Sequence, residues 1–124
     1  MDINRVEFQE IPSQGIVIAR IRGTRYDAID LINKKFVAHA TSKIIIEPAS
    51  YGGTDNRYLM PNSYKAVARC HPDDTYNFET GKRIALNKLI DTYHSGLDRR
   101  YALFLEDMDK VLKKMDVYFE GRTF

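Results

Sequence analysis

Arginine, aromatic and amide side chains occur in this sequence in groups that could bind a nucleotide. Arginines cluster at residues 20–25 and recur at Arg57, and aromatic and amide side chains surround the start of a predicted helix near residue 78. A guanidinium pairs with a phosphate through two N–H donors at once, and an aromatic ring stacks on a base. An asparagine amide both donates and accepts, as the edge of adenine requires. The residues concerned are Arg20, Arg22, Arg25, Arg57, Tyr58, Tyr76, Phe78, Arg83 and Asn87.

The groups that covalent catalysis or metal binding would need are poorly placed. Cys70 and His71 are adjacent on a predicted strand, where neighbouring side chains point to opposite faces, so the imidazole cannot activate the thiol. A tetrahedral metal site would need Cys70, His71 and Asp73 or Asp74 together with a distant fourth ligand. We expect the two aspartates to cap the next helix instead. The sequence therefore predicts no catalytic residue and no metal site.

Phosphate-binding loops of the common nucleotide-dependent enzymes are also missing from the sequence. There is no Gly-Lys-Ser/Thr loop and no Gly-x-Gly-x-x-Gly between a strand and a helix. Gly52 and Gly53 lie in a long predicted loop over residues 49–62, away from any helix start. We therefore expect a protein that is not an enzyme and that carries no cofactor.

Composition and charge limit the remaining classes of function. The 124 residues match one domain and are 44% hydrophobic and 29% charged, which is typical of a folded chain. Nineteen basic against 17 acidic residues give a net charge of +2, which is small for a non-specific DNA coating protein. A single cysteine excludes an intrachain disulfide, and the start MDINRVEFQE lacks the apolar run of a signal peptide. We expect a cytoplasmic protein that does not cross a membrane.

The first half of the chain is predicted to form a small sheet. Residues 4–10 alternate apolar and polar side chains, and residues 15–22 are rich in β-branched residues. The Pro12-Ser13-Gln14-Gly15 turn between them predicts a β-hairpin. Two further strands are expected at residues 43–47 and 64–70.

Helical periodicity appears at residues 25–38, with Thr24 as an expected N-cap, and dominates the second half of the chain. We expect one helix over residues 78–93, begun by Asn77 or Asp74, a break at Ser95-Gly96, and a longer helix over residues 98–119. The apolar stripe of that last helix extends beyond its own core and could serve a partner subunit.

These elements predict an α+β fold in which a small antiparallel sheet packs against C-terminal helices, the last of them long. The chain forms a single domain over residues 1–124. It is sheet-rich over residues 1–70, helical over residues 71–119, and ends in a short tail over residues 120–124.

The segment Ala66–Leu89, AVARCHPDDTYNFETGKRIALNKL, resembles a pattern found in small proteins of phages and prophages. In that pattern a strand ending in Ala-x-Cys is followed by Pro-x-Asp, an aromatic residue and a helix with Gly-Lys-x-x-Ala. Within that group, the layout of the whole chain is similar to the first type of Thoeris anti-defence proteins, which phages encode. Those proteins have a similar size, with an antiparallel sheet followed by two helices.

The resemblance implies a protein that acts as a sponge for immune signals in the cytoplasm of a host bacterium. The family binds, without cleavage, cyclic ADP-ribose signals that bacterial TIR-domain enzymes make. Some members also bind cyclic oligonucleotides at a second pocket, and members assemble as dimers that build hexamers. On this resemblance Phe78 and Asn87 would contact adenine, and Arg25 and Arg57 would hold phosphate. The second pocket would use Arg122 and Thr123.

Two other functions and one structural interpretation remain open beside the sponge. A small nucleic-acid-binding module would contact the phosphate backbone with its basic residues, and its affinity would fall steeply with salt. A protein inhibitor would instead dock an exposed helix on a host protein. In the structural interpretation the arginines are scattered over a surface sheet and Phe78 only packs the helix onto it.

Overall fold

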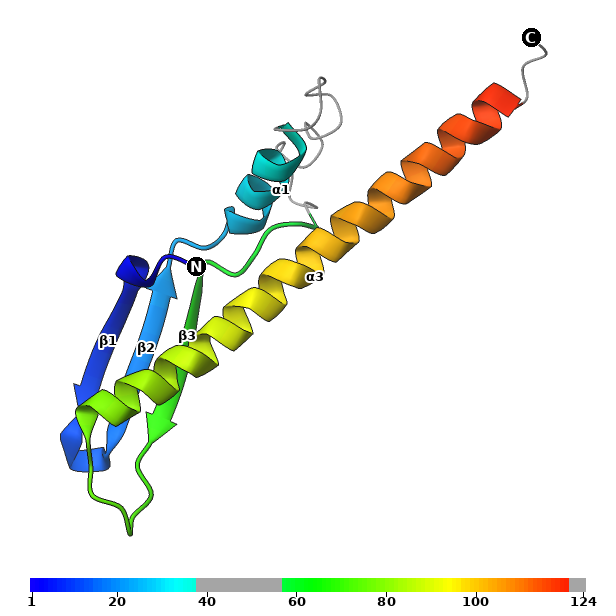
Figure 1. The fold of residues 1–124 in the computed structure, drawn as a ribbon. Helices are drawn as coiled ribbons and strands as arrows, with labels where there is room; N and C mark the ends of the chain where they lie inside the picture. The colour runs from blue at the N-terminus through cyan, green and yellow to red at the C-terminus, as the bar shows by residue number, and fades with distance from the viewer. Residues whose placement is uncertain (38–56, 121–124) are drawn as a thin grey trace.

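The computed structural model of the protein describes residues 1–37 and 57–120 and has the predicted α+β fold (Figure 1). Three antiparallel strands form one sheet in the order β1-β2-β3, and a long helix lies across it. Two single-turn 3-10 helices precede and follow β1, at Ile3–Arg5 and Pro12–Gln14. The main elements are β1 (Val6–Ile11), β2 (Ile16–Arg22), α1 (Asp27–Val37), β3 (Ser63–Arg69) and α3 (Phe78–Glu120).

The predicted β-hairpin is confirmed and joins β1 to β2. Pro12 opens the connecting 3-10 turn, and Gly15 closes it with φ of 62°, a left-handed conformation that glycine adopts at little cost. The turn fixes the register, in which Val6 faces Ile21 and Ile11 faces Ile16. A shift of one residue would move every apolar side chain of β2 to the other face of the sheet.

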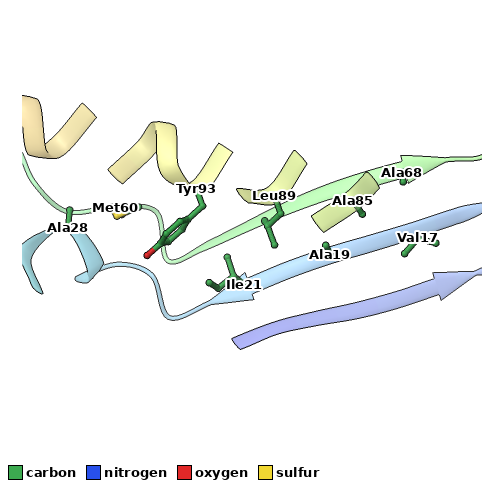
Figure 2. Close-up of a cluster of buried hydrophobic side chains, with 9 residues drawn as sticks. All are labelled: Val17, Ala19, Ile21, Ala28, Met60, Ala68, Ala85, Leu89 and Tyr93. Carbon is green, nitrogen blue, oxygen red and sulfur yellow. The ribbon is translucent and has the colours of Figure 1, made fainter. Parts of the chain in front are cut away.

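One face of the sheet is buried under α3 (Figure 1). Val17, Ala19 and Ile21 of β2 point to this face and are almost fully buried, together with Ala68 of β3. The helix contributes the other half of this core. Figure 2 shows Ala85 and Leu89 directed at β2, and Tyr93 extending toward the connection between β2 and α1. Since successive strand residues point to opposite sides, Ile18, Arg20 and Arg22 lie on the other face.

The predicted break at Ser95-Gly96 is wrong, because α3 runs without interruption over 43 residues from Phe78 to Glu120. At a rise of 1.5 Å per residue the helix is about 64 Å long. Gly96 is buried in the helix, and a Cβ there would overlap the Tyr64 hydroxyl. This glycine therefore permits close packing of the helix on β3. The two helices predicted for the second half of the chain are one.

The first α-helix, α1, packs against the middle of α3. Ala28, Ile29 and Ile32 are buried, and Ile32 forms a second apolar cluster with Phe104 of α3. Thr24, predicted as an N-cap, uses its hydroxyl differently: it is fully buried and donates to the Pro61 carbonyl at 2.5 Å. That bond attaches the entry to α1 to the segment before β3.

Several predicted features lie outside the described residues. They are the strand at residues 43–47, residues 49–56 of the long loop, and residues 121–124 of the tail. Among the helices of the described residues, none combines the length and the apolar character that crossing a membrane requires.

Close contact at Gly81 leads to a first testable expectation. A Cβ at this position would lie 2.5 Å from the Cγ2 atom of Val17, which is buried and stiff. Glycine to alanine inside a helix ordinarily stabilises by about 1 kcal/mol. Here we expect Gly81→Ala to lower the free energy of unfolding, because overpacking costs about 1–3 kcal/mol.

The measurement is urea unfolding of Gly81→Ala, Val17→Ala and the double variant. We expect the double variant to be more stable than the sum of the single changes predicts, since the smaller side chain at residue 17 removes the clash. Ser95→Ala, at an exposed position of the same helix, is the control and should be neutral or stabilising. Additive effects would contradict the proposed contact.

Candidate functional site

A cavity of about 360 Å³ lies where β3 ends and α3 begins. Val17, Ala68 and Gly81 form part of its apolar lining, and the connection between the two elements supplies most of its polar side chains. This volume falls in the range of about 300–1,000 Å³ that small-molecule sites occupy. We refer to it as the β3–α3 cavity.

Local hydrogen bonds give the connection its shape. The amide of Cys70 donates to the Gly15 carbonyl at 2.7 Å, and the amide of Asp74 donates to the His71 carbonyl at 2.9 Å. Asn77 is the cap of α3, because its Oδ1 atom accepts from the Thr80 amide at 3.1 Å. Of the two expected caps, Asn77 and Asp74, it is Asn77 that accepts a hydrogen bond from the first turn of α3.

The capping role predicted for Asp73 and Asp74 does not hold. Asp74 is exposed and lines the cavity, and Asp73 lies beside the His71 ring, with 3.6 Å between its Oδ2 atom and Nδ1. Asn77 stands immediately before the helix, so its short amide reaches the first turn. The aspartates lie in the turn that leads from the strand.

Tyr76 gives the cavity its most informative polar group. Its hydroxyl is shielded from solvent. Burial raises the pKa of Tyr76, and the charge of the nearby Glu10 carboxylate and its hydrogen-bonding interaction with the hydroxyl raise the pKa further. The phenol is therefore neutral at physiological pH, ready to donate and to accept. Glu10 is the acceptor nearest to this shielded hydroxyl.

The remaining polar groups of the cavity come from both ends of the connection. Arg69, His71 and Thr80 line it, and the N-terminus of α3 opens toward it. The thiol of Cys70 donates weakly to the carbonyls of His71 and Asp74, both at 3.5 Å. It does not bond to the imidazole. Within residues 1–37 and 57–120 no group of three or more potential ligands could hold a metal ion.

Three of the residues predicted to bind ligand lie on the first turns of α3. Phe78 is half-buried against the sheet, and the Lys82 ammonium lies 5.2 Å from the centre of its ring. The same ammonium lies 5.0 Å from the ring of Phe8 on β1. Arg83 and Asn87 are exposed and one helical turn apart. These three lie near the β3–α3 cavity along the helix but do not line it.

The other predicted phosphate ligands lie far from Phe78. Arg25 is exposed between β2 and α1, with its guanidinium 5.8 Å from the ring of Tyr26. Arg57 pairs with Asp107 at 2.8 Å, and 29 residues of helix separate Asp107 from Phe78. At 1.5 Å per residue that separation is about 43 Å. One chain therefore does not bring Arg57 and Phe78 into one site, because α3 is unbroken.

Arg122 and Thr123 lie outside the described residues. Tyr76 belongs to the predicted group near the helix start, whereas Thr80 and Gly81 line the cavity and are not among the predicted residues. The small size of Gly81, four residues before Ala85, was the available indication that the helix lies close to the sheet there.

No known protein family matches the chain, and no curated protein or solved structure shows significant similarity to it.

The cluster around Arg57 leads to an expectation for alkaline pH. Burial, followed by the hydrogen bond to Asp107, raises the pKa of Tyr58 to about 12. An unfolded tyrosine has a pKa of about 10. The stability from this group is thus fully present below pH 10 and is lost as the pH rises through 12.

We expect Tyr58→Phe to reduce the loss of stability between about pH 10 and pH 12, measured by urea unfolding across that range. Tyr26→Phe is the matched control, because the Tyr26 side chain is 52% exposed. An unchanged pH profile in Tyr58→Phe would contradict the assignment.

Proposed function

We propose that the protein binds and sequesters a small nucleotide signal of the cyclic ADP-ribose type in the β3–α3 cavity, without degrading it. The observation that carries the proposal is the cavity at the start of a long helix, with Tyr76 among its lining residues. The class of nucleotide comes from the resemblance of Ala66–Leu89 to phage anti-defence proteins.

The chemistry of the cavity supports a ligand with an apolar, flat part and an anionic part. Val17, Ala68 and Ile84 supply apolar lining for a base, and Tyr76 supplies a hydrogen bond that can recognise its edge. The first turn of α3, which supplies Thr80 and Gly81 to the lining, carries partial positive charge. Phosphate groups commonly bind at helix N-termini for this reason.

The proposal relocates the site from the one that the resemblance implied. Phe78, Arg83 and Asn87 remain near the proposed ligand, because all three lie on the first turns of α3. Arg25 follows the far end of β2, and Arg57 pairs with the middle of α3. Neither arginine belongs to the proposed cavity. Sequestration depends on affinity alone, so the proposal requires no catalytic group.

The test is calorimetric titration of the protein with cyclic ADP-ribose and with the filtrate of a TIR-domain enzyme reaction. We expect Tyr76→Phe to bind about 2- to 12-fold more weakly, the equivalent of one hydrogen bond of about 0.5–1.5 kcal/mol. Tyr26→Phe, which removes an exposed hydroxyl, should bind as the unmodified protein does. The ligand recovered after heat denaturation should be intact. Absence of binding, or recovery of a cleaved nucleotide, would refute the proposal.

We also propose that the distal part of α3 pairs with the same part of a second copy of the chain. Leu105, Val111 and Leu112 are 45%, 48% and 53% exposed, although they are large apolar side chains. Leu105 and Leu112 are seven residues apart and share one stripe of the helix. Such a stripe is typical of helices that pair.

Charge order favours an antiparallel pair. The acidic residues Glu106, Asp107 and Asp109 precede the basic residues of the next turn, which are Lys110, Lys113 and Lys114. A parallel pair would place like charges side by side, whereas an antiparallel pair centred near Lys110 places acidic turns beside basic turns.

We expect Leu112→Glu to convert the protein to a monomer in size-exclusion chromatography with light scattering. Leu112→Met keeps an apolar side chain of similar volume and should preserve the dimer. A monomeric unmodified protein at concentrations near 100 μM would show that this stripe does not bind a second copy.

A further inference from the structure

The face of the sheet opposite α3 carries a concentration of positive charge. Strand alternation places Arg20, Arg22 and Lys65 on this face, and the described residues place no helix over it (Figure 1). A shallow hollow of about 540 Å³ lies there, lined by Arg20, Arg22, Asn62, Ser63 and Lys65. Every one of these side chains can donate a hydrogen bond, and no carboxylate lines the hollow.

The strand register brings two of these cations together. Arg20 lies directly opposite Lys65 in the β2–β3 pair, and like charges at such positions destabilise a sheet. Within the described residues neither side chain forms an ion pair. Glu7, opposite Arg20 on β1, pairs instead with Arg22 at 3.5 Å. That contact is weak, since both of its side chains are more than 60% exposed.

Three cations therefore face one carboxylate on a rigid surface. An anion between Arg20 and Lys65 would offset the repulsion that the sheet otherwise bears. Phosphate fits this arrangement best, because a guanidinium binds two of its oxygens at once and an ammonium binds as a point charge. Asn62 and Ser63 would add neutral donors at the end where β3 begins.

We infer that this hollow is a phosphate-binding site, distinct from the β3–α3 cavity. The two lie on opposite faces and at opposite ends of the sheet, since Ser63 begins β3 and Arg69 ends it. The site is independent of the proposed nucleotide cavity. The hollow is large enough to leave room beside a phosphate for an attached group, as in a free nucleotide or in the backbone of a single strand.

The experiment titrates labelled protein with pyrophosphate and with a twelve-residue oligothymidylate while amide NMR signals are followed. We expect at least one of the two compounds to shift the amide signals of residues 20–22 and 62–65. The double variant Arg20→Gln/Lys65→Gln should weaken binding tenfold or more, because it removes two charge-assisted contacts. The control Lys34→Gln/Arg99→Gln removes the same charge from exposed positions elsewhere and should bind within twofold of the unmodified protein.

Salt dependence distinguishes the two sources of phosphate. Oligothymidylate affinity that falls with salt with a log–log slope near 2 would identify a nucleic-acid backbone, as about three phosphate contacts require. Tight pyrophosphate binding that the oligonucleotide does not displace would identify a free nucleotide. Both results support the site.

Thermal unfolding, with and without pyrophosphate, checks the same inference. Arg20→Gln should keep or raise the melting temperature of the free protein, because it relieves the repulsion with Lys65. In the unmodified protein, pyrophosphate should raise the melting temperature. Equal loss of binding in the control pair, or no signal shift with either compound, would overturn the inference. Tyr76→Phe should leave phosphate binding at this hollow unchanged. A failure of the phosphate-site inference can therefore be distinguished from a failure of the proposed nucleotide cavity.

Discussion

The close approach of α3 to β2 is the contact on which the rest of the structure depends. The helix faces the sheet with small side chains at Gly81 and Ala85, followed by the buried Leu89. A side chain at residue 81 would meet Val17, so the distance between helix and sheet is set there. This contact fixes where the first turn of α3 stands and thus creates the cavity beside it. It also fixes the direction in which the distal part of the helix leaves the sheet (Figure 1).

A polar cluster then holds α1 to this frame. The hydroxyl of Tyr93 donates to the Asp27 carboxylate at 2.7 Å, and the guanidinium of Arg5 donates to the same oxygen at 3.0 Å. Burial, then the bond to Asp27, raises the pKa of Tyr93, which keeps its proton for donation. Arg5 also donates to the carbonyls of Arg22 and Gly23. One carboxylate thus connects the start of β1, the start of α1 and the middle of α3.

The sequence predicts the elements of this fold better than the contacts between them. Alternation over residues 4–22 and the Pro-Gly turn predict the hairpin, because both are local properties. Gly96 predicts a helix break because glycine has a low helix propensity. In the structure it lies within α3, where its lack of a side chain makes room for the hydroxyl of Tyr64, 32 residues earlier. The pairing of Arg20 with Lys65 is equally non-local, because it depends on a strand register across the loop that separates β2 from β3. Tyr76 could be selected as an aromatic near a helix start, but the shielding of its hydroxyl from solvent follows only from packing.

The unbroken helix decides how many chains the nucleotide site needs. A break at residue 96 would have let the second half of the chain fold back, so that Arg57 and Phe78 could share a ligand. The continuous helix instead holds Asp107, the partner of Arg57, about 43 Å from Phe78. Antiparallel pairing centred near Lys110 does not reunite them, because it brings residue 107 of one chain beside about residue 113 of the other. A site at the start of α3 must therefore be built from groups that the same chain supplies there, which are those of the β3–α3 cavity.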